Sequence, residues 1–72
     1  MSRYLFIIEK QDDIYSAYSP DLPDCVAVGD TQEEVEKKME TMIESLISDK
    51  QRNGHAIPKP RSTAYYVTIE HE

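Results

Sequence analysis

Apolar residues gather in three short stretches within the first thirty positions of this chain. Residues 3–9 (RYLFIIE) are rich in β-branched and aromatic side chains, and residues 14–19 and 25–28 form two further short runs. Such composition is typical of strands. Only the turn-forming run at 10–13 separates the first two stretches, so they are expected to pair as an antiparallel hairpin. The pattern predicts a three-stranded antiparallel meander.

A helical period begins after residue 31. Thr31 and Glu34 have the spacing of a capping box, in which the threonine hydroxyl accepts from the amide of residue 34 and the glutamate carboxylate accepts from the amide of the cap residue. Gly54 suits the position just past a helix C-terminus. We predict a helix over about 32–53, with one apolar face at spacings of three and four formed by Val35, Met39, Met42, Ile43, Leu46 and Ile47.

A fourth apolar run, residues 64–69 (AYYVTI), follows a proline-bearing linker and predicts a C-terminal strand. The expected fold is α+β, in the order β-β-β-α-β, with residues 1–72 forming a single domain. A right-handed crossover would place the last strand parallel to the first, giving the strand order 3-2-1-4. One helix covers one sheet face, and residues 3–9 are apolar on both sides. A homo-oligomer, a dimer or larger, is therefore expected to cover the other face.

The charge balance limits the classes of partner that this protein is expected to bind. The chain has 14 acidic and 8 basic residues, a net charge of −6, which argues against binding a nucleic acid backbone and against direct DNA binding. No apolar stretch approaches the roughly 18 residues of a membrane span, and the N-terminus has no signal-peptide pattern. A single cysteine fits a reducing compartment. We expect a soluble cytoplasmic protein.

Candidate catalytic and metal-binding residues have simpler structural explanations. The aspartates all fall in predicted turns or at the helix cap, where this residue is favoured for local hydrogen bonding. Cys25 alternates with Val26 in a predicted strand and is expected to be a small buried apolar residue. We predict no catalytic residue, no cofactor and no metal site. The metal candidates weighed are Asp12, Asp13, Asp21, Asp24, Asp30, His55 and His71.

One surface feature has two open interpretations. On a helical wheel, four glutamates fall on one flank of the predicted helix, beside Ile43 and Ile47. This acidic flank could dock a basic protein. It could equally be a solvated surface with some like-charge repulsion. The residues of the acidic flank are Glu33, Glu36, Glu40 and Glu44.

The segment YSPDLPDCVAVGDTQEEV, residues 18–35, resembles the sequence pattern of the HicB family of antitoxins. The G-x-x-I-P-x-P run formed by Gly54, Ile57, Pro58 and Pro60 resembles the family pattern after the helix. Asp24 departs from it, because the family usually has glycine there. The matching positions in the first segment are Pro20, Asp21, Leu22, Pro23, Cys25, Gly29, Asp30, Thr31 and Glu34.

The resemblance implies a partial RNase H-like fold and a function as a type II antitoxin. Such a protein binds and neutralises a HicA-like toxin, a small basic ribonuclease that cleaves messenger RNA, and is not itself an enzyme. Many relatives carry a C-terminal DNA-binding domain, for which this sequence leaves no room, so a stand-alone domain is expected. The partner-binding candidates are the acidic flank with Asp21 and Asp24. The positions expected to shape the turns within residues 18–35 are Pro20, Pro23, Gly29, Thr31 and Glu34.

Two alternatives stay open. One is a degenerate RNase H-like nuclease that uses Asp21, Asp24 and a metal ion. The other is an orphan oligomeric binding module without catalysis. The low basic content weighs against the nuclease, because an enzyme that cuts RNA needs basic surface to hold it.

Overall fold

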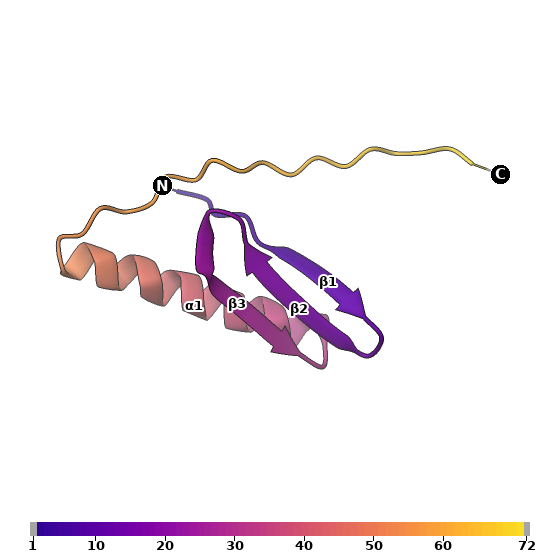
Figure 1. The fold of residues 1–72 in the computed structure, drawn as a ribbon, viewed down its shortest axis with the longest axis horizontal. Helices are drawn as coiled ribbons and strands as arrows, with labels where there is room; N and C mark the ends of the chain where they lie inside the picture. Colours follow the sequence, from indigo (N-terminus) through magenta and orange to yellow (C-terminus); the bar gives the residue numbers. More distant parts are fainter. Residues whose placement is uncertain (1, 72) are drawn as a thin grey trace.

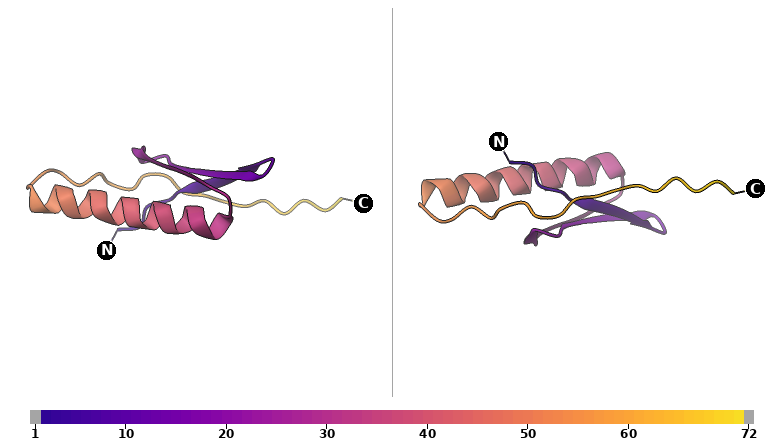
Figure 2. Two further views of the ribbon diagram at one scale, coloured as in Figure 1. Left: turned by 90° about the horizontal axis from the view of Figure 1, so that it is seen from below. Right: turned by 90° about the horizontal axis from the view of Figure 1, so that it is seen from above.

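The computed structural model describes residues 2–71 and shows one sheet with one helix on it. The elements follow the order β1 (Ile7–Gln11), β2 (Ile14–Ser19), β3 (Leu22–Gly29) and α1 (Gln32–Arg52). Both strand pairs are antiparallel and the sheet order is β1-β2-β3. The helix lies along one face of the sheet (Figures 1 and 2). The predicted meander, the helix and the α+β class are confirmed.

The two hairpins turn in different ways. β1 and β2 are joined by Asp12 and Asp13, and Asp12 has a positive φ of 57°, which aspartate tolerates better than most residues. β2 and β3 turn through residues 20–21, after which the register is irregular, because Ser19 pairs with Leu22 and Tyr18 with Val26. Residues 23–25 therefore bulge out of the ladder, where a proline costs no ladder hydrogen bond.

Two strand bounds differ from the expected ones. β3 begins at Leu22 rather than 25, because the strand resumes directly after the turn and carries the bulge within it. β1 begins at Ile7 rather than 3, because its ladder with β2 ends at the pair of Ile7 with Tyr18, although β2 continues to Ser19. Instead, the Ser19 hydroxyl donates to the carbonyl of Leu5 over 2.8 Å. Residues 3–6 thus run past the end of the paired sheet.

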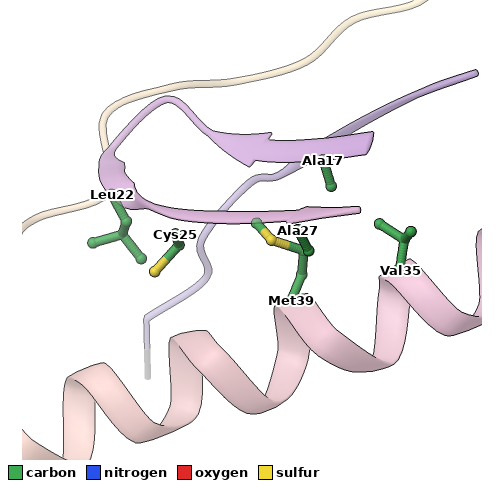
Figure 3. Packing of buried hydrophobic residues seen from close by; sticks show 6 residues of the cluster. All are labelled: Ala17, Leu22, Cys25, Ala27, Val35 and Met39. Carbon is green, nitrogen blue, oxygen red and sulfur yellow. The ribbon is translucent and has the colours of Figure 1, made fainter. Parts of the chain in front are cut away.

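The core is one thin layer between the sheet and α1 (Figure 3). The sheet contributes small side chains, and Val35 and Met39 of the helix are fully buried against them. Gly29 shows how close the approach is. A Cβ there would lie 2.9 Å from Glu34 Cδ and 3.0 Å from Val35 Cγ2, so a side chain at this position would force the side chains at the helix start to shift. The core residues are Ala17, Leu22, Cys25, Ala27, Val35 and Met39.

Both ends of α1 are capped by the residues that the sequence indicated. Thr31 Oγ1 accepts from the Glu34 amide over 3.1 Å, and Glu34 Oε1 accepts over 3.1 Å from the amide of Asp30, one residue before the cap. At the other end, Gly54 has a φ of 71°. Its amide donates to the carbonyl of residue 51 and the next amide donates to that of residue 50, which is a Schellman motif.

The expected fourth strand is not formed within this chain. Residues 64–69 are extended but pair with no strand of the described residues, and they project away from the sheet (Figure 1). The physical reason lies in where the helix sits. α1 packs mainly on β3 and β2 and touches β1 least, so a strand added outside β1 would gain little cover from it. High β propensity alone does not make a strand when no buried surface is on offer.

The chain leading to this segment is nonetheless tied to the sheet. Asp21 Oδ2 accepts from the amides of Arg61 and Ser62, each over 2.9 Å, and Asp21 Oδ1 accepts from the Ser62 hydroxyl over 3.0 Å. The Tyr4 hydroxyl donates to the carbonyl of Pro58. These contacts, which we call the tail anchor, fix residues 58–62 beside the turn between β2 and β3.

The Thr31 cap predicts a measurable loss of stability. Thr31→Ala removes the acceptor for the Glu34 amide and should lower the free energy of unfolding by about 1 kcal/mol. Urea unfolding should show a lower midpoint with an unchanged slope. Thr41→Ala is the matched control, because Thr41 is exposed within α1 and alanine has the higher helix propensity. Equal midpoints for the two variants would contradict the cap.

The tail anchor predicts a pH-dependent contact. The hydrogen bonds from the amides of Ser62 and Arg61 hold the pKa of Asp21 below its usual value of 3.8. A lowered pKa in the folded state means that the stabilisation is complete above pH 4 and is lost as pH falls through the lowered pKa. The amide NMR shifts of both residues should therefore titrate with a midpoint below 3.8.

A variant checks the same contact at neutral pH. Asp21→Ala should speed hydrogen exchange at the Arg61 and Ser62 amides, because their acceptor is gone. Asp24→Ala, a change at a neighbouring exposed aspartate, should leave both rates as they are. If Asp21→Ala leaves both rates unchanged, the tail is held by other contacts.

Candidate protein-binding surface

The acidic flank lies on the exposed side of α1. Glu33, Glu40 and Glu44 are exposed, and Glu36 is half-buried. The Gln32 amide nitrogen donates to Glu36 Oε2 over 3.0 Å, which orients that carboxylate along the helix. Among the ion pairs within residues 2–71, none involves the four glutamates of the flank. Their negative charge is therefore available to a partner.

The acidic flank meets, at Glu44, a groove of about 560 Å³ whose lining is part apolar and part polar. The groove lies between α1 and the segments at both ends of the chain, and Glu44 stands at its margin. Its apolar lining comes from Tyr4, Ile43, Ile47 and Ile57. The expected neighbourhood of glutamates with Ile43 and Ile47 is thus present, and the structure adds Ile57, which sequence spacing could not place there.

The opposite flank of α1 has a different character. Lys38 Nζ lies 3.0 Å from Glu34 Oε2 and donates to the Val28 carbonyl over 2.7 Å, which ties the helix to the end of β3. The same lysine, with the Asp30 amide, holds the pKa of Glu34 below its usual value. Beside it, a second groove of about 690 Å³ lies between β3 and α1, lined by Val26, Ala27, Lys37, Lys38, Thr41, Met42, Ser45, Leu46 and Asp49.

Asp21 and Asp24, the two remaining partner-binding candidates, lie in different settings. Asp21 is half-buried and both of its oxygens serve the tail anchor, whereas Asp24 is exposed in the β3 bulge. Within residues 2–71, no group of three or more histidine, cysteine, aspartate or glutamate side chains is placed to hold a metal ion. The structure therefore gives Asp21 an internal structural contact and leaves Asp24 as a surface charge.

Cys25 is a core residue. It is 1 % exposed and packs in the layer between the sheet and α1 (Figure 3). Burial, followed by the charge of Asp24, raises the pKa of the thiol. A buried thiol with a raised pKa is a poor nucleophile, so the interpretation of Cys25 as a small apolar residue agrees with its surroundings.

The predicted motif residues lie at two separate connections, one at each end of β3. Pro20 lies in the turn that ends β2, and Pro23 lies in the bulge of β3. Gly29 admits the helix start at close range, where Thr31 and Glu34 form the cap. The two prolines therefore belong to the β2–β3 connection, and the other three residues to the entry into α1.

The uncovered apolar sheet face that residues 3–9 led us to expect lies opposite α1, but its exposed members come from β2 and β3. Ile14, Tyr18, Val26 and Val28 are between 41 % and 57 % exposed there. For β3 the sequence signal was the alternation along the strand, where Cys25 and Ala27 point to the core and the two valines point away. We call this surface the open sheet face.

No helix within residues 2–71 has the length and apolar character needed to cross a membrane. No curated protein and no solved structure matches the sequence. The family model described as the HicB-like antitoxin of bacterial toxin–antitoxin systems matches residues 4–71, nearly the whole chain. The chain therefore belongs to the family of HicB-like antitoxins of bacterial toxin–antitoxin systems.

Proposed function

We propose that this protein is a cytoplasmic, non-enzymatic antitoxin that binds and neutralises a small basic HicA-like ribonuclease. The observation that carries the proposal is the acidic flank of α1 beside a partly apolar groove, on a chain of net charge −6. A toxin that binds RNA needs a basic surface, and an acidic flank is complementary to it.

The arrangement of charges on α1 supports this choice of surface. Lys38 faces β3 and is engaged by Glu34, so it does not neutralise the acidic flank. Glu36, Glu40 and Glu44 follow one another at four-residue spacing, which costs the isolated helix a few tenths of a kcal/mol for each pair. A partner with lysine or arginine side chains would relieve that repulsion, and opposite charges would speed the encounter.

The groove supplies the apolar part of the contact. Interfaces draw much of their binding free energy from a few side chains buried at the centre, with charged residues at the rim. In the groove, Ile43, Ile47 and Ile57 provide apolar surface and Glu44 provides a charge beside them. This matches an interface with an apolar centre and a charged rim. We propose that a toxin side chain enters the groove while the glutamates form the rim.

Asp24 is the remaining candidate contact outside the flank. It is exposed in the bulge of β3, where a basic partner could pair with it at little cost in desolvation. Asp21 is proposed to act indirectly, because its carboxylate holds the segment that carries Ile57. The same engagement weighs against the nuclease alternative, since a carboxylate that already accepts three hydrogen bonds has little left for a metal ion.

We further propose that the assembled protein is a homo-oligomer with a partial RNase H-like fold, in which the three-stranded sheet gains a fourth strand. In that sheet residues 64–69 form the fourth strand beside β1, giving the order 3-2-1-4. The support is the free edge of β1 together with the β-rich composition of the segment. Direct DNA binding is not part of the proposal, in keeping with the acidic charge balance.

The acidic flank predicts a slower encounter when it is neutralised. Glu36→Gln, Glu40→Gln and Glu44→Gln together should slow association with the basic protein encoded next to this chain, by on the order of tenfold at low salt. Dissociation should change less, because rim charges act mainly on the encounter. Stopped-flow kinetics at several salt concentrations measures both rates.

The matched control removes the same number of charges at the far end of the sheet. Glu9→Gln, Asp12→Asn and Asp13→Asn lie in or beside the β1–β2 turn, away from the groove. Equal slowing by both triple variants would mean that only net charge matters, and no slowing by either would make the flank a solvated surface. RNA cleavage by the purified protein in magnesium, lost on Asp21→Asn, would overturn the antitoxin proposal.

A further inference from the structure

The C-terminal segment exposes large apolar side chains. Tyr65 and Tyr66 are 89 % and 92 % exposed, and Val67 and Ile69 are 69 % and 67 % exposed. Residues 62–69 carry no charged side chain. An extended, uncharged run of this kind is costly to leave in water. We call residues 64–69 the tail strand, and its surroundings decide what covers it.

The segment before the tail strand is fixed while the strand itself is free. The tail anchor holds Arg61 and Ser62 on Asp21. Pro60 and residues 62–64 also line a hollow with residues 3–6, which lead into β1. Beyond that point the chain runs straight past the sheet, and the views from below and above agree (Figures 1 and 2). The tail strand therefore passes close to the start of β1 of its own chain but does not pair with it.

The same chain offers a surface that lacks such a strand. β1 is an edge of the sheet, so the peptide groups on its outer side have no strand partner among the described residues. The register places Ile7, Tyr18 and Val26 side by side across the three strands on the open sheet face. This row ends at Ile7, at the edge where another strand would be added.

We propose that the tail strand of one copy pairs along β1 of a second copy, which returns its own tail strand in exchange. Each chain then supplies one strand and one edge, so the contact is self-complementary and closes as a two-fold dimer. The tail's uncharged composition suits the apolar row that ends at Ile7. The period of two puts Tyr65, Val67 and Ile69 on one side of the added strand, so that one of them can continue the row at Ile7.

A second copy fits better than either alternative occupant. The proposed basic toxin would be attracted by the acidic flank of this chain. That flank lies on α1, across the sheet from the open sheet face. Pairing with the chain's own β1 is not what the structure shows, because the tail strand runs past that edge without joining the sheet (Figure 1). Exchange instead sets the edge of each copy against the other, so that the second copy adds apolar cover that one chain lacks. The inference concerns self-assembly and does not depend on toxin binding.

The first experiment measures mass with the full chain. Sedimentation equilibrium at tens of micromolar should give a dimer, twice the 8.3 kDa of one chain. Val67→Pro removes an amide and breaks strand pairing, so it should weaken the dimer at least tenfold. His71→Pro, the same change outside the tail strand, should leave it intact. A monomeric wild-type protein, or a dimer untouched by Val67→Pro, would overturn the proposal.

The second experiment separates exchange from pairing within one chain. Chains labelled with ¹³C and unlabelled chains are mixed, unfolded and refolded together, and isotope-filtered NOEs are recorded. Contacts from the side chains of Tyr65, Val67 or Ile69 to Ile7 should appear between labelled and unlabelled chains. If these contacts occur only within one chain, or if the dimer shows none of them, the exchange is wrong. Val67→Pro should keep the far-UV circular dichroism of α1, which shows that it acts on assembly rather than on folding.

Discussion

The contact between the first two turns of α1 and the small side chains of the sheet is the constraint on which the molecule depends. Val35 and Met39 are fully buried against Ala17, Ala27 and Cys25, and a Cβ at position 29 would press on the side chains of Glu34 and Val35. One such layer is all the core that a chain of this size provides. The helix packs mainly on β3 and β2 and least on β1. Because it lies on one face only, the open sheet face keeps its apolar residues in contact with solvent.

The parts of the fold that could be predicted are those decided by nearby residues. The helix and both of its caps follow from spacings of three and four, and the β1–β2 hairpin follows from a short polar turn. The C-terminal strand predicted over 64–69 is not formed within one chain, because its formation depends on whether an edge offers buried surface, and propensity does not report that. The start of β3 differed from the prediction because the strand resumes directly after the turn at 20–21 and contains the bulge at 23–25.

The candidate surface divides in the same way. Helical periodicity predicted that Glu36, Glu40 and Glu44 share a flank with Ile43 and Ile47, because side chains on one helix face follow from the period alone. The role of Asp21 was beyond the sequence. The surrounding sequence indicated that Asp21 lies in a turn or contacts a partner. In the structure its oxygens accept hydrogen bonds from Ser62, which is 41 residues away in the chain. Contacts of that separation depend on the path of the whole chain.

The tail anchor lies between the two proposed interfaces. On one side it holds the segment that presents Ile57 to the groove beside the acidic flank, and on the other it fixes the point from which the tail strand departs. The proposed toxin contact and the proposed copy-to-copy contact therefore use different surfaces of one chain, so neither excludes the other. Since both depend on where residues 57–62 lie, ordering this segment by either contact would favour the other. The two associations would then be thermodynamically linked, and the linkage would have to act equally in both directions.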